Sequence, residues 1–423
     1  MRVTLILVCA LATAGGGVTA QNATTLQLVQ VLYRHGARTP IYSYPNDTNA
    51  DHWWQGPGQL TNEGKNNQYE LGAYLRRRYA GFLSPLYHTN HTQVESSDVD
   101  RTLMSAQVNL AALYPPQGRD KWNPDLAWQP IPVHTRPSTD DYKLRFIDAC
   151  ERYRQARKEL DSSEYVRKVD RKYAPLYKYL HSVGVMLNDV EGLSGLYDTL
   201  WIDDRHGLAI PEWARRRLPA FNRTVYPELL RPISDLAFQL FSHTAEMRRL
   251  GGGVLLADMT EHMAAAAAGS LQPLGRQLFM YSAHDFTVAA LLGALGVYNG
   301  IAPPLASCVI VELHRDASGA FFVEMFYRND TTAEPYRLRL PGCADRCPWE
   351  AFRDLTAAVR PADAAAECAV SPPPTPAPPS PPALIVAAVL VCGLLLVLLV
   401  AALVLYCRRR RDEQFHYSAL STN

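Results

Sequence analysis

Two arginines and a histidine form the first group of residues in this 423-residue chain that could do chemistry. Arg34, His35 and Arg38 lie in the stretch RHGARTP, directly behind the apolar run 28–33. Each guanidinium group can donate two or more hydrogen bonds to phosphate oxygens, and an imidazole held between two of them can attack phosphorus through a ring nitrogen. Gly36 leaves room for close approach of an anion. The cluster predicts phosphoryl transfer with His35 as nucleophile, and a basic surface turn is the alternative.

A second histidine follows another short apolar stretch. Residues 278–281 are typical of a strand and residues 288–295 of a buried helix, so His284 and Asp285 lie at a strand-to-helix junction. Ligands gather at the carboxyl ends of strands in α/β sheets, and a helix N-terminus offers unpaired N–H groups to an anion. An aspartate before a helix is most often only an N-cap, so this pair alone indicates little.

Arg101 occupies the first turn of an expected amphipathic helix that begins near Val99. Asp98 or Asp100 is the expected N-cap of that helix. Arginine is disfavoured at the positive end of a helix dipole, which indicates that Arg101 is placed there for a ligand. An ion pair with Asp98 or Asp100 is the alternative.

The motifs RHGARTP, DRTLMSA and YSAHD occur in this order, and together they resemble those of the histidine acid phosphatases. The resemblance spans about residues 26–368 and is strongest to the lysosomal and prostatic branch. It implies a phosphohistidine intermediate on His35 and proton donation to the leaving group by Asp285. It implies no metal or other cofactor, because arginines supply the positive charge. The residues that it assigns to phosphate binding are Arg34, Arg38, Arg101 and His284.

Three positions depart from the family pattern. Ala37 stands where relatives often have aspartate, and Phe286 stands where a small hydroxyl residue is usual. Both are expected to flank the pocket and to bear on substrate preference. Ile202 replaces a cysteine that would pair with Cys308, which leaves Cys308 without a partner.

Cysteine counting agrees with that departure. Five of the eight cysteines lie outside the N-terminal leader and the hydrophobic tail segment, so one is left over. Cys343 and Cys347 are spaced for a local disulfide; zinc is the alternative, but no second ligand pair lies nearby. The family resemblance pairs Cys150 with Cys368.

Both ends of the chain carry targeting signals. Residues 1–20 have the charged start, apolar core and small-residue end of a signal peptide. Residues 383–406 are apolar throughout and long enough to span a bilayer, and the arginines at 408–411 place a cytoplasmic tail, 407–423, in the type I orientation. The proline-rich stretch 371–382 predicts an extended stalk. Five sequons predict glycosylation, at Asn22, Asn46, Asn90, Asn222 and Asn329.

Tyr417 and Leu420 have the spacing of a tyrosine-based sorting signal that clathrin adaptors bind. They lie on a short polar segment that we expect not to fold alone, and extended peptides of this kind enter binding grooves. Such short matches are common by chance, so an ordinary tail is the alternative. Together with the resemblance, the signal predicts a protein of the lysosomal or endosomal membrane or of the cell surface.

The luminal part, residues 21–370, is too long for one simple core. Strand patterns and all three motifs lie in its outer parts, whereas residues 145–250 are rich in charge, tyrosine and leucine at helical spacing. We therefore expect an α/β fold, with a central mixed sheet flanked by helices. A smaller helical cap domain is expected at roughly 131–250, as the family's phosphoglycerate-mutase-like fold implies, together with one C-terminal transmembrane helix.

These features predict an acid phosphatase, a phosphoric monoester hydrolase. The alternatives are a catalytically inactive receptor-like ectodomain on the same scaffold, a phytase-like phosphatase and a relative of the mutases, which the leader and anchor disfavour. The net charge of +1 and the lack of a luminal basic run give no support to nucleic-acid binding. The resemblance also suggests a homodimer.

Overall fold

A seven-stranded mixed sheet forms the centre of the computed structural model, which describes residues 25–370 and 381–420. The strand order is β2-β5-β1-β6-β7-β8, and β9 pairs with β7. Strands β1, β2 and β5 run parallel to one another, whereas β6 to β9 belong to antiparallel pairs. The strands are β1 (Leu26–Arg34), β2 (Thr92–Ser96), β5 (Leu278–Ala283), β6 (Cys308–Arg315), β7 (Phe321–Arg328), β8 (Tyr336–Leu338) and β9 (Cys347–Pro348).

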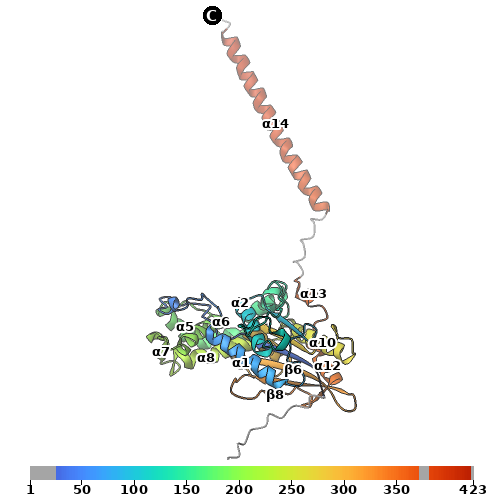
Figure 1. Cartoon of the computed structure of the whole chain (residues 1–423). Helices are drawn as coiled ribbons and strands as arrows, with labels where there is room; N and C mark the ends of the chain where they lie inside the picture. Colours follow the sequence, from blue (N-terminus) through green and yellow to red (C-terminus); the bar gives the residue numbers. More distant parts are fainter. Residues whose placement is uncertain (1–24, 371–380, 421–423) are drawn as a thin grey trace, which may run out of the picture. The chain divides into compact units, whose positions relative to one another are not determined.

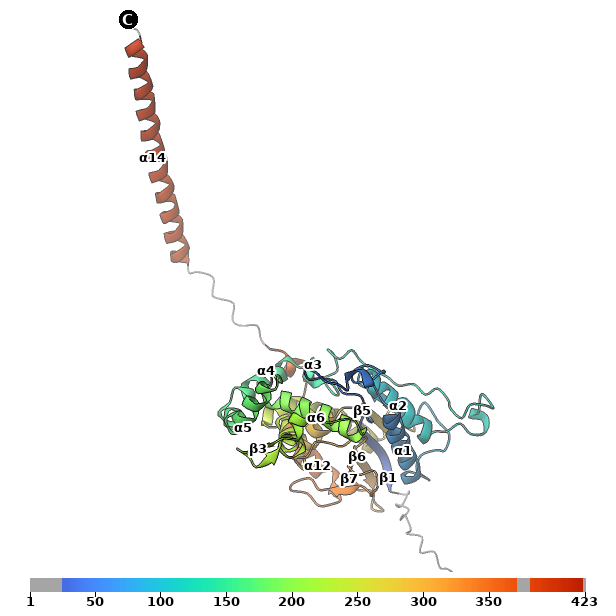
Figure 2. The ribbon, with the colours of Figure 1, turned by 90° about the vertical axis from the view of Figure 1, so that its left-hand side faces the viewer.

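Helices cover both faces of this sheet, which explains why β1 is apolar on both sides. Val29 and Val31 pack into one core with α1 and α2, whereas Leu28 and Leu32 pack into another with α10, α11 and α12. Figure 2 shows α1 and α2 on one side of strands β1, β5, β6 and β7. These helices are α1 (Asn62–Arg78), α2 (Asp100–Leu113), α10 (Gly252–Ala267), α11 (Asp285–Ala294) and α12 (Trp349–Thr356), followed by a short 3-10 helix, η4 (Ala357–Val359).

The parallel pairing of β1 with β5 brings the two histidine motifs together. Arg34 is in register with Ala283, the last residue of β5, and the backbone N–H of His35 donates to the carbonyl of Ala283 at 3.0 Å. Because parallel strands end at the same edge of a sheet, His35 and His284 leave it side by side. The site is therefore built where the sequence predicts, at the carboxyl ends of two strands.

The residues between β2 and β5 include a group of helices, which Figure 1 shows around the labels α5 to α8. This group begins at Phe146 and not near residue 131, because residues before it still belong to the sheet region. His134 exchanges backbone hydrogen bonds with β2, accepting from Ser96 and donating to Val94. The insertion also contains a two-stranded ribbon, β3–β4. Its elements are α3 (Phe146–Ala149), α4 (Glu151–Asp161), α5 (Glu164–Ser182), α6 (Val190–Arg205), α7 (Glu212–Arg215), β3 (Arg217–Leu218), β4 (Arg223–Thr224), η3 (Val225–Leu229), α8 (Leu230–Leu240) and α9 (Ala245–Leu250).

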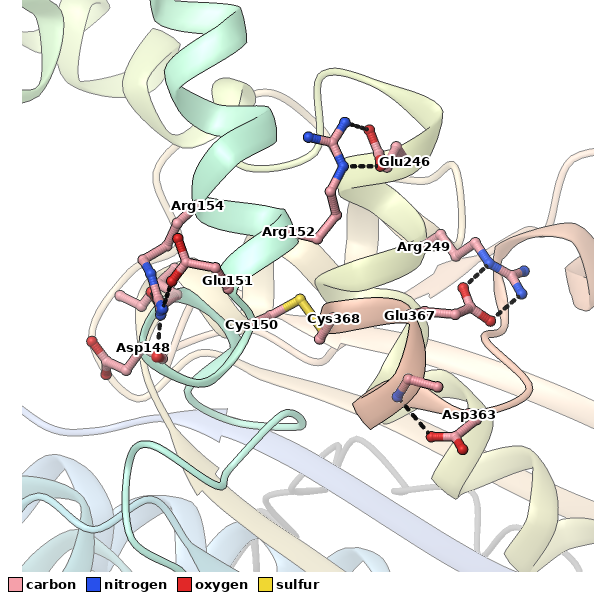
Figure 3. The surroundings of a disulfide bond; sticks show 12 residues. Asp148, Cys150, Glu151, Arg152, Arg154, Glu246, Arg249, Asp363, Glu367 and Cys368 are labelled. Atoms are coloured by element: carbon pink, nitrogen blue, oxygen red, sulfur yellow. Dashed lines mark hydrogen bonds and ion pairs between the residues drawn. A yellow bond between two sulfur atoms is a disulfide. The ribbon is translucent and has the colours of Figure 1, made fainter. Parts of the chain in front are cut away.

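A disulfide joins this insertion to the C-terminal end of the compact unit that ends at Ala369 (Figure 3). Cys150 lies between α3 and α4, and Cys368 ends α13 (Ala364–Cys368). Two arginine–carboxylate pairs surround the bridge, Arg152–Glu246 and Arg249–Glu367, and both tie α9 to its neighbours. The bridge and the two pairs thus fix the segment that leads from the sheet into the insertion.

The second unit contains one helix, α14 (Pro381–Leu420). By length and composition, its residues Leu384–Arg411 could cross a membrane. Proline suits the first turn of a helix, which explains why the helix includes the last two residues of the expected stalk. The helix also continues through Tyr417 and Leu420, where we expected an unfolded tail. The expected signal peptide, Asn22 and stalk residues 371–380 lie outside the described residues.

Candidate active site

His35 is held with one ring nitrogen free to react. Its Nδ1 lies 2.8 Å from the carbonyl oxygen of Gly36, and since a carbonyl only accepts, Nδ1 carries the proton. Nε2 is then the unprotonated nitrogen. Burial lowers the pKa of His35 well below its usual value, and the charges of Arg101 and Arg34 lower it further. The imidazole therefore stays neutral, as a nucleophile must.

Gly36 has a different role from the one that the sequence indicates. A Cβ added there would lie 2.1 Å from the carbonyl oxygen of Gly64 in helix α1. A Cβ added to Gly64 would lie 2.0 Å from the carbonyl oxygen of Ala37. The two glycines let the RHG loop and α1 touch backbone to backbone, so they position His35 instead of making room for an anion.

Three arginines surround the histidine; Arg34 and Arg38 are buried, and Arg101 is half-buried. Arg34 is paired with Asp285 at 2.8 Å, and Arg38 is paired with Asp198 of α6 at 2.9 Å. In the described part of the chain, the buried Nε atoms of Arg34, Arg38 and Arg101 have no hydrogen-bond partner. Buried donors without partners are costly, and an anion with several acceptor oxygens would satisfy them. The arrangement suits a phosphoryl group.

Arg101 points to His284 and not to the neighbouring aspartates. Its Nη2 lies 3.3 Å from Nδ1 of His284, and within residues 25–370 it makes no ion pair with Asp98 or Asp100. The N-cap of α2 is Val99, without a side-chain bond, so the expected aspartate cap is wrong. Burial and the nearby Arg38 lower the pKa of Arg101 to about 10, so it remains a cation in acid.

His284 is contacted on both ring nitrogens. Nε2 lies 2.8 Å from the hydroxyl of Ser97 and 3.3 Å from Nη1 of Arg145, while Nδ1 faces Arg101. Burial, followed by the charges of Arg101 and Arg145, lowers the pKa of His284 well below its usual value. Sequence reasoning missed Ser97 and Arg145. Ser97 adjoins the DRTLMSA motif, but no motif marks Arg145.

Asp285 begins helix α11, and His284 takes the N-cap position. One carboxylate oxygen accepts from the backbone N–H of Phe286 at 2.9 Å, and the other pairs with Arg34. Burial raises the pKa of Asp285, but the charges of Arg34 and Arg38 outweigh it, so the net pKa lies below the usual value. The carboxyl is therefore ionised when it is paired with Arg34.

A cavity of about 400 Å³ opens from this cluster towards the insertion. Arg34, Arg38 and Asp285 line one part of it, and most of the rest is lined by residues of α6 and α8, with Tyr42, Arg157, Phe241 and the segment 301–304. The outer lining carries aromatic rings and both signs of charge, from Tyr197, Trp201, Phe238, Glu191, Asp235 and Arg231. The leaving part of a substrate would contact this wall.

Ala37 and Phe286, two of the departures from the family pattern, adjoin the residues of the site but do not line that cavity. Phe286 packs behind His284, with the ring centroids 5.0 Å apart and the rings nearly parallel at 7°. Ala37 lines a separate narrow cavity beside Arg38 and Ile202. Phe286 therefore acts on the site through His284, and Ala37 through the loop that carries His35.

The cysteines are arranged as the sequence and the resemblance imply. Cys343 is bonded to Cys347, which removes the zinc alternative at this pair. Cys308 is free and buried, and burial raises the pKa of its thiol to about 12. Of the described sequons, Asn46, Asn90 and Asn222 are exposed and Asn329 is half-buried.

One group among the described residues could hold a metal, Glu312, His314 and Glu324 on strands β6 and β7. The ligand atoms lie within 4.8 Å of one another. Their carboxylates already pair with arginines, Glu312 with Arg78 at 2.9 Å and Glu324 with Arg337 at 2.8 Å. These cations balance the carboxylate charge, so the donor set does not favour a further cation.

Comparisons with known proteins agree with this geometry. The chain is 43% identical over 356 residues to the lysosomal acid phosphatase of Homo sapiens, covering 83% of this chain and 82% of the relative. It is 42% identical over 350 residues to the prostatic acid phosphatase of Homo sapiens, covering 82% of this chain and 88% of the relative.

Solved structures share the fold at low sequence identity. The phytase of Hafnia alvei in complex with tartrate is 17% identical, covers 83% of this chain and 100% of its own, and has a TM-score of 0.58. The phytase of Citrobacter braakii is 18% identical, covers 82% and 100%, and has a TM-score of 0.56. The family model of the histidine phosphatase superfamily (branch 2) matches residues 25–328. The chain therefore belongs to the histidine phosphatase superfamily, branch 2.

Proposed function

We propose that this protein is an acid phosphatase that hydrolyses phosphate monoesters through a phosphohistidine intermediate on His35. One observation carries the proposal: a neutral histidine lies among three arginines, each with a buried Nε that has no partner in the described chain, and one of these arginines is paired with a carboxyl group. The names of the relatives, lysosomal and prostatic acid phosphatase, support the same activity.

The proposed reaction has two displacements at phosphorus. Nε2 of His35 attacks, the phosphorus–oxygen ester bond breaks, and Asp285 gives a proton to the departing alkoxide. Arg34, Arg38, Arg101 and His284 bind the transferring phosphoryl oxygens and stabilise their charge. Water then attacks the phosphohistidine, gives its proton to the Asp285 carboxylate, and releases phosphate and free His35.

The outer cavity favours a monoester with a single phosphate over a polyphosphate. Glu191, Asp198 and Asp235 line it, so further phosphate groups would meet negative charge. Of the arginines in the wall, Arg38 and Arg157 already pair with carboxylates. Aromatic and polar walls fit an uncharged or mixed leaving group. This composition disfavours the phytase-like alternative.

The covalent intermediate gives the decisive test. Brief exposure to a ³²P-labelled monoester, followed by an alkaline quench, should leave label on His35, because phosphohistidine survives base. Since His35 is only 1% exposed, His35→Gln is a better variant than alanine for removing the nucleophile while keeping its volume. Label on an aspartate or serine would contradict the mechanism, and an inactive wild type would support the receptor-like alternative.

The remaining proposals concern location. A type I protein of the lysosomal or endosomal membrane or the cell surface is supported by the relatives' name and by the one helix of the described residues that is long and apolar enough to cross a membrane. Exposed sequons at Asn46, Asn90 and Asn222 agree with a glycosylated luminal domain. Endoglycosidase treatment would measure glycosylation, and protease protection in intact vesicles would measure the membrane orientation. The homodimer implied by the resemblance can be tested by light scattering of the full chain in detergent.

A further inference from the structure

We propose that Arg145 is a positioning residue of the phosphate site, which fixes the tautomer of His284 so that Nδ1 carries the proton and donates to the phosphoryl oxygen. This inference deepens the proposed function and rests on it, because it assumes that His284 binds the phosphoryl group.

Arg145 reaches the site from the start of the insertion and is held there. Its Nε donates to Asp148 at 2.6 Å, and only 17% of its side chain is exposed. The guanidinium carbon lies 5.6 Å from the ring centroid of Phe286, which in turn stacks on His284. Nη1 then lies 3.3 Å from Nε2 of His284. The three side chains form one ordered group.

The backbone next to Arg145 is bonded to α11, the helix whose N-cap is His284. The carbonyl of Asp141 accepts from the N–H of Arg145 at 2.9 Å, and a carboxylate oxygen of Asp141 accepts from the N–H of Leu144 at 2.8 Å. The hydroxyl of Thr287, on α11, donates to the carbonyl of Leu144 at 3.0 Å. The guanidinium therefore keeps its place relative to the imidazole.

The contacts of His284 cannot all be hydrogen bonds at once. A guanidinium only donates, and a neutral imidazole has one N–H and one acceptor nitrogen. Arg145 faces Nε2 and Arg101 faces Nδ1, each at 3.3 Å. One of the two nitrogens therefore presents an N–H to a cation, and only an acceptor placed between them relieves that contact.

Geometry decides which nitrogen carries the proton. With the phosphoryl group bound by Arg101 as proposed, one of its oxygens could accept from both Arg101 and Nδ1, because Nη2 of Arg101 faces Nδ1. Nε2 is enclosed by Ser97 and Arg145, and the Ser97 hydroxyl can donate as well as accept. With a proton on Nε2 instead, a lone pair on Nδ1 would face the anion, and the Nε2 proton would face Arg145. The cation of Arg145 thus selects the Nδ1–H form.

The charges around the ring keep it neutral, so that its tautomer matters. Arg101 on α2, Arg145 before α3, and Arg34 and Arg38 at the end of β1 all oppose protonation of His284. The other titratable neighbours are His35, with ring centroids 5.7 Å apart, and Asp285, which adjoins it in the chain. Burial acts in the same direction as the arginines and lowers the pKa of His284.

The test is a double-mutant cycle on the full-length chain in detergent, with inorganic phosphate as the probe in isothermal titration calorimetry. Arg145→Met should weaken phosphate binding by about 10- to 100-fold and raise KM by a similar factor, with a smaller change in kcat. In the His284→Asn background, Arg145→Met should weaken phosphate binding by less than about a further twofold, because Arg145 acts through the His284 imidazole, which is then absent. Arg145→Lys should restore part of the affinity.

Arg154→Met is the matched control, because Arg154 lies on the same segment and donates to the carbonyl of Asp148 without touching His284. It should leave phosphate binding unchanged. Loss of Arg145 should also make phosphate binding depend on pH. The loss of affinity relative to the wild type should become smaller in acid, because a protonated His284 donates from both nitrogens. A structural defect would not follow pH in this way.

Two outcomes would overturn the inference while leaving the proposed function intact. In the first, the wild type is active and the losses of phosphate affinity caused by Arg145→Met and His284→Asn add up in the double variant. In the second, Arg154→Met weakens phosphate binding as much as Arg145→Met does. A wild type without phosphatase activity, or phosphate binding unaffected by His284→Asn, would overturn the proposed function and this inference with it.

Discussion

Oδ2 of Asp285 lies 2.8 Å from Nη2 of Arg34, so the proposed proton donor is paired with a proposed phosphate ligand. Because this pairing holds the pKa of Asp285 below its usual value, the carboxyl has already lost its proton at the pH of an acidic compartment. A phosphate monoester that enters as the monoanion brings the missing proton with it. We expect substrate binding to shift Arg34 from the carboxylate to the phosphoryl group.

This predicts that the substrate sets the alkaline limb of the pH profile. We expect kcat/KM to fall as pH rises through the second ionisation of the monoester, which is about 6 for a phosphoserine-like group. A monoester with a lower second pKa should move the limb to lower pH by the same amount. Measured profiles for two such substrates check this. If the alkaline fall in kcat/KM occurs at the same pH for both substrates, it reports the ionisation of a group on the enzyme.

Asp285→Asn should separate substrates by their leaving groups. Without a proton donor, alkyl phosphates should slow by about 100- to 10,000-fold, whereas p-nitrophenyl phosphate, whose leaving group barely needs a proton, should slow far less. Parallel kcat/KM measurements on both substrates test this. Equal losses would assign Asp285 to holding Arg34 in place. Arg38→Lys is a useful comparison, because it alters a proposed phosphate ligand and leaves the Asp285 carboxyl group present.

The disulfides should contribute unequally to stability. By loop-closure entropy, Cys150–Cys368, with a sequence separation of 218, contributes about 5 kcal/mol, whereas Cys343–Cys347, with a separation of 4, contributes about 2 kcal/mol. Urea denaturation of the two double alanine variants should rank them in that order. Since Cys150 lies on the segment that carries Arg145, its loss should also weaken phosphate binding. The reverse ranking would contradict the estimate.

Cys308 should be the only luminal thiol. In the native chain it is buried with a raised pKa, so we expect no reaction with maleimide. After denaturation without reductant, mass spectrometry should find label on Cys308, Cys392 and Cys407. Cys308→Ala, which should remove only the luminal label, serves as the control. Label on Cys150 or Cys368 would mean that the bridges have rearranged.

Tyr417→Ala should raise the amount of protein at the cell surface without changing its phosphatase activity. The last turn of α14 contains residues 417–420, and binding in an extended groove requires that turn to unwind. Terminal turns fray at little cost, so the helix does not prevent recognition. Antibody uptake by living cells measures the effect, with Ser418→Ala as control. Equal uptake by wild type and mutant would rule the signal out.

The sequence predicts the core of the site well because its parts lie at strand ends. Strand patterns before His35 and His284, together with the rule that ligands gather at carboxyl ends, are enough to bring the two histidines together. The sequence indicates Arg101 because arginine is unfavourable in the first turn of a helix. In the structure its side chain contacts His284. Each of these residues carries a local sign of its role.

Arg145 carries no such sign, and the sequence does not predict its place. It precedes a four-residue helix in the insertion and meets His284 only through the tertiary fold, 139 positions away. The start of the insertion is missed for a related reason, since the pairing of His134 with β2 depends on a distant edge strand. Gly36 shows the third limit, because its contact with Gly64 is a packing constraint between two segments.

The parallel pairing of β1 and β5 also governs when the site can appear during synthesis. β1 is synthesised early, but its partner β5 follows more than two hundred residues later. Until then β1 is an apolar strand with unpaired edges, the kind of segment that associates with other chains. Nascent chains of this protein should therefore bind molecular chaperones for longest before residue 283 emerges. A ribosome-arrested chain that stops short of β5 should have no phosphatase activity, however well its first helices fold.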